Sequence, residues 1–74
     1  MSRSVKRAVK TALVSADKHM LNGEITPAAI ESVGNVFFNA YYKGRNPTGT
    51  ADSPYFRSIG KAVLEATRST KPEQ

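Results

Sequence analysis

Four cationic side chains gather in the first ten residues, MSRSVKRAVK, and no acid separates them. They are Arg3, Lys6, Arg7 and Lys10, and the first acid in the chain is Asp17. The 74-residue chain has a net charge of +5: this segment supplies +4, and the other seven bases and six acids add only +1. Cations clustered at one end of an otherwise balanced chain indicate a phosphate-rich or carboxylate-rich partner.

These cations fall in or near the first turn of a predicted helix. A positive charge there opposes the helix dipole, by roughly 0.3–1 kcal/mol when exposed. A local cost without local compensation is typical of a functional surface. Free backbone N–H groups at a helix start, with Arg and Lys beside them, make a phosphate-binding surface. The alternative interpretation is a solvated basic face that only aids solubility.

A second candidate contact region lies in the segment Tyr-Tyr-Lys-Gly-Arg-Asn, residues 41–46. Aromatic rings beside bases at a helix end can stack on nucleobases and contact phosphates. Tyr41 lies on the apolar side of its predicted helix, so the candidates for contact are Tyr42, Lys43 and Arg45. An exposed aromatic edge at Tyr42 would equally suit a protein partner.

No catalytic or metal-binding set is visible in the sequence. His19 is the only histidine, and there is no cysteine. The acids are scattered singly, without the spacing of metal ligands or of a catalytic carboxylate pair. The glycines match no phosphate-loop pattern. The sequence therefore predicts a protein that is not an enzyme and has no metal or cofactor.

Three predicted helices position these residues. The first runs from about Ser4 to Leu21, with Ser2 or Ser4 as its cap, and stops at Asn22-Gly23. In the second, Thr26 is the cap, Pro27 takes the first position, Ile25 packs on Ile30, and Lys43-Gly44 ends the helix. The third opens at Asp52-Ser53-Pro54, and its outer side carries Arg57, Lys61, Glu65 and Arg68.

Apolar residues at three- and four-residue spacing define the expected inner faces. On the first helix they are Val5, Val9, Ala12, Leu13, Ala16 and Met20. On the second they are Ile30, Val33, Phe37, Ala40 and Tyr41, widened by Val36 and Phe38. On the third they are Phe56, Ile59, Val63 and Ala66. We expect Phe37 at the centre of the core, with Val9, Leu13, Ile59 and Val63 as neighbours.

Two glycines stand in the middle of predicted helices, at a cost of about 1 kcal/mol each relative to alanine. They are Gly34 in the second helix and Gly60 in the third. A helix tolerates such a residue where two backbones approach closely. We therefore predict that the second and third helices cross at Gly34 and Gly60.

The predicted fold is a small all-α domain: a helical hairpin with a third helix packed on it. It covers residues 1–68, and residues 69–74 form a flexible polar tail. Leu, Ile, Val and Phe together number 15, which is about 20% of the chain. A core this thin rarely yields more than about 3–5 kcal/mol.

The sequence offers no transmembrane segment, because no apolar run approaches the roughly 18 residues that a span requires. The absence of cysteine is compatible with a reducing compartment, so we expect a cytoplasmic, intracellular protein. The basic, serine-containing start resembles a mitochondrial transit peptide, which is the alternative. Against it, the helical pattern continues without a break to Met20.

The function predicted first is non-enzymatic binding of nucleic acid, DNA or RNA, through the basic first helix. The second helix is too apolar to lie in a DNA groove, which argues against a simple helix-turn-helix reader. One alternative is a small regulator or inhibitor of the phage or mobile-element type that docks on a larger protein. Another is a structural subunit of a larger assembly. The anionic surface could also be an acidic protein or a membrane, and a homo-oligomer stays open.

Overall fold

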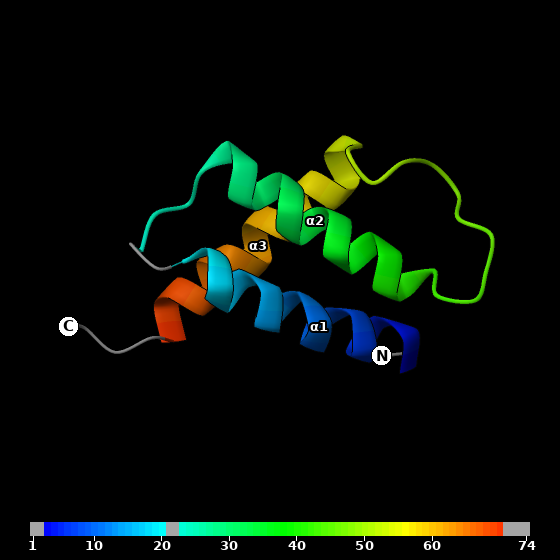
Figure 1. The fold of residues 1–74 in the computed structure, drawn as a ribbon, viewed down its shortest axis with the longest axis horizontal. Coiled ribbons are helices and arrows are strands. Elements are labelled where there is room, and N and C mark those ends of the chain that lie inside the picture. Colours follow the sequence, from blue (N-terminus) through cyan, green and yellow to red (C-terminus); the bar gives the residue numbers. More distant parts are fainter. Residues whose placement is uncertain (1–2, 21–22, 71–74) are drawn as a thin grey trace.

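The computed structural model describes residues 3–20 and 23–70, which form three α-helices (Figure 1). They are α1 (Arg3–His19), α2 (Pro27–Tyr41) and α3 (Pro54–Thr70). Helices α1 and α2 lie side by side and antiparallel, and α3 crosses behind them. Helix α2 packs on both of the others, which contact each other less. The predicted all-α domain, a hairpin with a third packed helix, is confirmed.

Helix α1 is shorter at its end than the sequence predicts. It stops at His19 rather than Leu21, and Ser4 lies inside it. Gly23 then takes a φ of +74°, and its N–H donates to the carbonyl of Met20 at 3.1 Å. The left-handed conformation explains why glycine follows this helix. The other predicted residues of these two ends, Ser2 and Asn22, lie outside the described residues.

The predicted start of α2 is confirmed. Thr26 has an extended backbone, and its hydroxyl accepts a hydrogen bond from the N–H of Ala29 at 3.1 Å. Pro27 takes the first helical position, where its missing N–H costs nothing. At the other end the N–H of Tyr42 donates to the carbonyl of Phe38 at 3.1 Å.

Helix α3 begins at Pro54, where the carbonyl of Ser53 accepts from the N–H of Arg57 at 3.0 Å. It continues to Thr70, two residues past Arg68, the last residue before the predicted tail. The remainder of the predicted tail, residues 71–74, lies outside the described residues.

Gly34 and Gly60 lie at a close crossing of α2 and α3, as the sequence predicts. A Cβ atom on Gly34 would lie 2.6 Å from the carbonyl oxygen of Phe56. A Cβ atom on Gly60 would lie 2.5 Å from the carbonyl oxygen of Ile30 and 2.8 Å from the nitrogen of Gly34. All of these neighbours are backbone atoms, so only glycine allows the two helices to approach this closely.

Alanine, rather than larger side chains, makes the inner face of α1. Ala8, Ala12 and Ala16 are completely buried and Met20 is nearly so. Leu13 remains 40% exposed, so the expectation that it joins the core is wrong. Small side chains at four-residue spacing let α1 lie close to its neighbours, and Leu13 falls at the margin of that face.

The inner face of α3 is also turned from the predicted one. Leu64 is completely buried, whereas Ala66 is exposed. The crossing explains this correction, because Gly60 must face α2. That orientation turns Phe56 and Leu64, each four residues away, inward with it. The hydroxyl of Thr67 is buried on the same face and donates to the carbonyl of Val63 at 2.9 Å.

All six aromatic rings of the chain form one cluster between the ends of α2 and α3. Phe38 contacts Phe56 edge-on, with ring centroids 4.9 Å apart, and Tyr41 contacts Tyr42 edge-on at 4.8 Å. Phe37 is buried, as predicted, and its ring lies 6.1 Å from Tyr41 and 6.3 Å from Phe56. This cluster fixes the end of α2, and with it the neighbouring Lys43.

Candidate anion-binding groove

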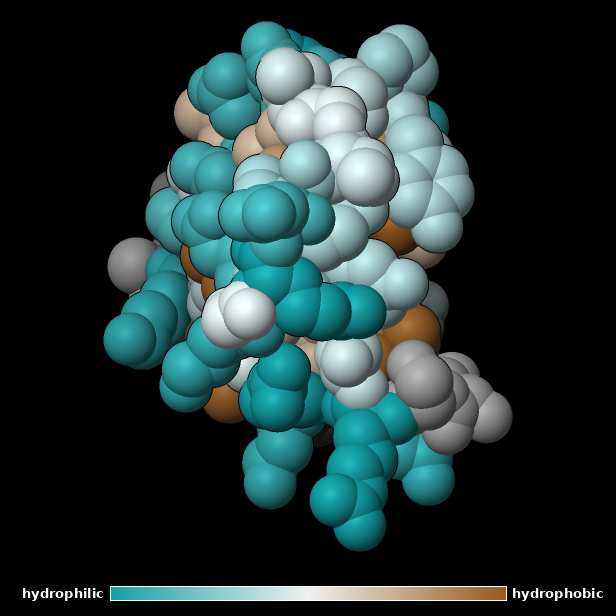
Figure 2. Space-filling model, turned by 90° about the vertical axis from the view of Figure 1, so that its right-hand side faces the viewer, coloured by the Kyte–Doolittle hydropathy of each residue, from teal (hydrophilic) through white to brown (hydrophobic). Residues whose placement is uncertain are grey.

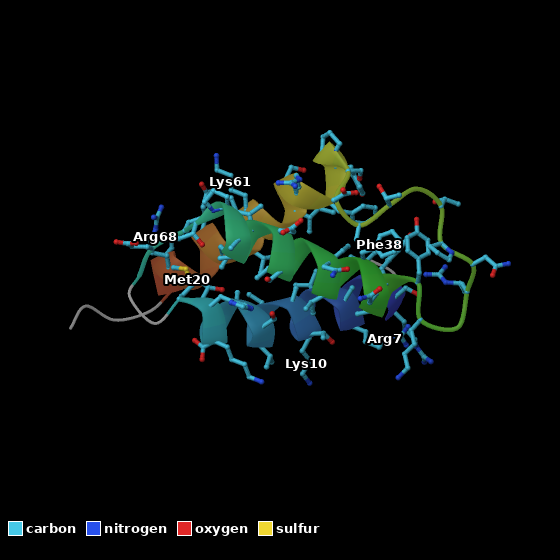
Figure 3. The ribbon with its side chains drawn as sticks, turned by 45° about the horizontal axis from the view of Figure 1, so that its top comes forward. Arg7, Lys10, Met20, Phe38, Lys61 and Arg68 are labelled. Atoms are coloured by element: carbon cyan, nitrogen blue, oxygen red, sulfur yellow. The ribbon has the colours of Figure 1, made fainter. Side chains whose placement is uncertain are left out.

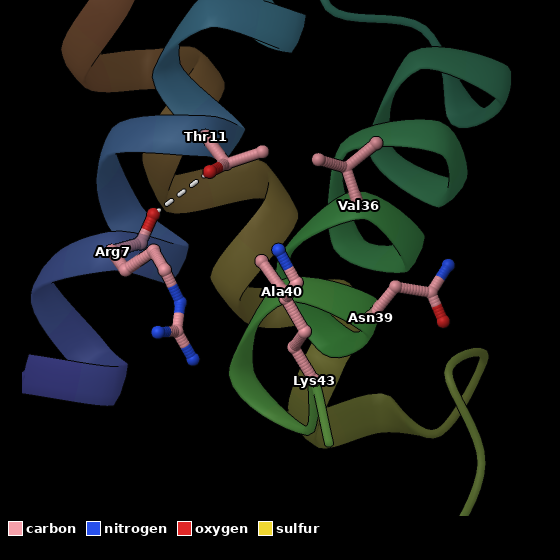
Figure 4. Close-up of a pocket in the computed structure, with 6 residues that line it drawn as sticks. All are labelled: Arg7, Thr11, Val36, Asn39, Ala40 and Lys43. Atoms are coloured by element: carbon pink, nitrogen blue, oxygen red, sulfur yellow. Dashed lines mark hydrogen bonds between the residues drawn. The ribbon is translucent and has the colours of Figure 1, made fainter.

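The antiparallel hairpin brings the first turns of α1 beside the last turn of α2. Arg7 and Thr11 project from α1 toward Val36 and Ala40 on α2 and toward Lys43 just after it, as Figure 4 shows. These residues line a shallow depression of about 360 Å³. Arg7 and Lys43 are separated by 36 positions in the sequence, and the hairpin places them at one opening.

A second depression of about 460 Å³ adjoins the first, because Thr11 and Val36 line both. We call the two together the α1–α2 groove. Its walls are made of six residues of α1, three residues of the second half of α2 and one residue just after α2. They are Arg7, Lys10, Thr11, Val14, Ser15 and Lys18, facing Val36, Asn39, Ala40 and Lys43.

The charge of the α1–α2 groove has one sign. Four of its ten residues are cations and none is an acid. Arg7 stands near the positive end of its own helix, but the hairpin also sets it beside the carbonyl end of α2, which carries partial negative charge. The carbonyl end of α2 thus offsets part of the unfavourable interaction between Arg7 and the dipole of α1. The groove cations remain exposed to a partner.

Two predicted contact residues of α1 lie outside the groove. Arg3 and Lys6 are exposed, but neither lines the two depressions. Successive residues of a helix are rotated by about 100°, so Lys6 points to a different side of α1 from Arg7. Figure 2 shows this end of the molecule, where mainly hydrophilic side chains cover the lower part, at the start of α1.

Two predicted contact residues of the 42–53 loop are engaged inside the chain. The guanidinium of Arg45 lies 4.9 Å from the ring centroid of Tyr41 and 5.7 Å from that of Tyr42, and it donates to the carbonyl of Tyr41. The hydroxyl of Tyr42 lies 2.7 Å from that of Thr48. Both side chains therefore hold the loop against α2, and neither lines the groove.

Several groove residues were not singled out from the sequence. Lys18 stands eight residues after Lys10, so both fall on one side of α1, and this spacing is the signal that could have found it. Val14 carries a weaker signal: it is an apolar residue outside the predicted inner face. Val36 and Ala40 carry no signal of a groove, because the sequence places them on the inner face of α2 and only the packing of the hairpin sets them beside an opening against α1.

The metal-ligating side chains of residues 3–20 and 23–70 do not gather at one site. No three side chains of the metal-ligating types come together in that part of the chain. His19 is exposed at the last position of α1.

The three helices also lack the length and apolar character needed to cross a membrane, as far as the described residues go. A further depression, between α2 and the 42–53 loop, is lined by Glu31 and Asp52, so its charge is opposite to that of the groove.

Comparison with known proteins gives no relative. No protein-family model matches the chain, and no match was found among the curated proteins or the solved structures.

Proposed function

We propose that this chain is a non-enzymatic binding protein whose α1–α2 groove receives a negatively charged macromolecule. One observation carries the proposal: three cations of α1 and Lys43, just after α2, line adjoining depressions whose lining residues include no acid. Cations presented by two rigid elements hold an anionic partner at fixed spacing and steer its approach. The proposal keeps the first helix as the contact element, with Arg7 and Lys10 as its contact residues.

Nucleic acid is the first partner to test. Arg7, Lys10 and Lys43 supply the charge that phosphates require, and Asn39 adds an amide at the rim of the groove. If the four groove cations each contact a phosphate of duplex DNA, log K falls against log salt with a slope of about −3.6, from about −0.9 per contact.

An acidic protein is the second candidate, and a different observation favours it. Val14, Val36 and Ala40 make part of the groove wall apolar. A phosphate backbone gains no binding energy from an apolar surface, whereas a protein partner can bury apolar side chains against it. This candidate corresponds to the small regulator or inhibitor that docks on a larger protein.

The test compares two double variants with equal loss of charge. Arg7→Gln with Lys10→Gln removes two groove cations, whereas Lys61→Gln with Arg68→Gln removes two exposed cations of α3. Figure 3 shows the first pair projecting on the α1 side and the second pair on the other side of the molecule. Binding is followed by fluorescence anisotropy with labelled duplex DNA, single-stranded DNA, RNA and polyglutamate at several salt concentrations.

We expect the groove variant to lose most of the binding to the anionic probe that the wild-type chain prefers. With DNA its salt slope should fall to about −1.8, because two of four contacts are gone. The α3 variant should bind nearly as well as wild type. Equal losses in the two variants, or no binding of any probe at low salt, would refute the proposal.

A further inference from the structure

The middle of the α1–α2 groove is apolar, although its rim is basic. Val14 is 56% exposed, more than Leu13, the other large apolar side chain of α1 that is exposed. Val36 lines the same depression from α2 and is only partly buried. The two valines leave an apolar surface open to solvent at the centre of the groove, and nothing in the described residues covers it.

The cations are arranged around this apolar surface. Lys10 and Lys18 stand four residues before and after Val14, so they flank it along the same side of α1. Arg7 and Lys43 close one end of the groove. From Arg7 to Lys18 the helix advances by about 16 Å, which is about three turns of an α-helix.

A partner that fits this pattern carries an apolar row with carboxylates beside it, placed to reach the cations of α1 and Lys43. We propose that the α1–α2 groove binds an acidic amphipathic helix of another protein. This proposal rests on the proposed function, because it requires the groove to bind anionic partners. Apolar residues at three- and four-residue spacing would cover Val14 and Val36, and flanking Asp or Glu would reach Lys10 and Lys18. Laying an amphipathic helix into a groove between two helices is a common mode of peptide recognition.

A second copy of this chain does not have the required chemistry. Each of its acids stands at least seven residues from the next along the sequence. A helix needs acids three or four residues apart to line one side with negative charge. No helix of this chain therefore offers the acidic face that complements the groove.

The probe for the experiment is a labelled synthetic helix of about 16 residues, enough to span three turns with its ends. Leucines occupy one face at three- and four-residue spacing, and glutamates flank them. The control peptide has the same composition in an order that spreads the leucines around the helix. Affinity is measured by fluorescence anisotropy, and the site is mapped by changes in the backbone amide NMR signals of the full chain.

The amphipathic peptide should bind at least about tenfold more tightly than the control peptide, with amide signals changing at Thr11, Val14, Ser15 and Val36. Val14→Ser separates apolar contact from charge, because it removes apolar surface and leaves every cation in place. It should weaken the amphipathic peptide roughly five- to tenfold. It should weaken the binding of polyglutamate or duplex DNA much less, because charge dominates the affinity for those probes. Since Val14 is largely exposed, the variant should keep the wild-type circular dichroism spectrum.

Three results would overturn this inference. The two peptides could bind alike, Val14→Ser could leave the amphipathic peptide unaffected, or duplex DNA could bind while neither peptide does. In each case the proposed function survives if Arg7→Gln with Lys10→Gln still removes most of the binding of the anionic probe. If neither the peptides nor the nucleic acids and polyglutamate bind, the inference and the proposed function fail together.

Discussion

At the scale of the residue, Leu13 and Leu64 are the same side chain in opposite surroundings. Leu64 is completely buried on α3, and Leu13 is 40% exposed on α1. Leu64→Ala would leave a cavity and should destabilise the fold by about 2–5 kcal/mol. Leu13→Ala should cost less than about 1 kcal/mol, because water already reaches that side chain. Urea unfolding followed by circular dichroism measures both.

The magnitude for Leu64→Ala is comparable with the whole stability of about 3–5 kcal/mol that a domain of this size affords. That variant should therefore be largely unfolded at room temperature, while Leu13→Ala melts near the wild-type temperature. If the two variants lost equal stability, the orientation of α1 or α3 described above would be wrong.

At the scale of the element, the crossing of α2 and α3 depends on two missing methyl groups. Helix propensity alone would make Gly34→Ala and Gly60→Ala stabilising by about 0.5–1 kcal/mol. In the structure each new Cβ would instead meet backbone atoms at 2.5–2.8 Å. Backbone cannot turn aside as a side chain can, so the helices must separate. We expect each variant to be destabilised by about 1–3 kcal/mol, measured by thermal unfolding.

The two substitutions are coupled, because a Cβ on Gly60 would lie 3.2 Å from the Cα of Gly34. Helices already pushed apart by one methyl accommodate the second more easily, so the double variant should lose less than the sum of the single losses. Ala62→Gly on the exposed side of α3 is the control and should cost about 1 kcal/mol through propensity alone. A higher melting temperature for either glycine variant would mean that the close crossing does not form.

At the scale of the whole molecule, the charge distribution opposes folding in the absence of a partner. The net charge is +5, and cations of α1 and of the end of α2 share one groove. The ion pair between Arg57 and Glu31, 3.8 Å long and largely exposed, contributes little. Screening should therefore stabilise the free protein. Raising sodium chloride from about 20 to 500 mM should raise the melting temperature by a few degrees.

The groove cations should account for much of this salt response. Replacing Arg7 and Lys43 by Gln should raise the melting temperature at low salt and flatten its dependence on salt. The same measurement on Lys61→Gln with Arg68→Gln serves as the control and should show a smaller change. A melting temperature that falls as salt is added would show that favourable ion pairs dominate instead.

The three helices and the crossing of α2 and α3 could be predicted from the sequence, because their causes are local. The start of α2 is marked by two adjacent residues, a threonine cap followed by proline. A glycine in mid-helix carries a cost that a close approach explains, so Gly34 and Gly60 could be paired before their contact was seen. The basic start likewise needed no structure, because charge is a property of composition.

Which side chains share a surface depends on how the three helices pack together. Whether Leu13 or Ala8 faces inward depends on how α1 is rotated against α2 and α3, and neighbouring positions on a helix differ too little in hydrophobic pattern to fix that rotation. The sequence predicts Tyr42 and Arg45 as contact residues for a partner. In the structure the loop folds back on α2 and engages both side chains. Lys43 and Arg7 line the same depression only because the hairpin is antiparallel. The two walls of the groove are therefore brought together by long-range packing, which a local pattern in the sequence does not encode.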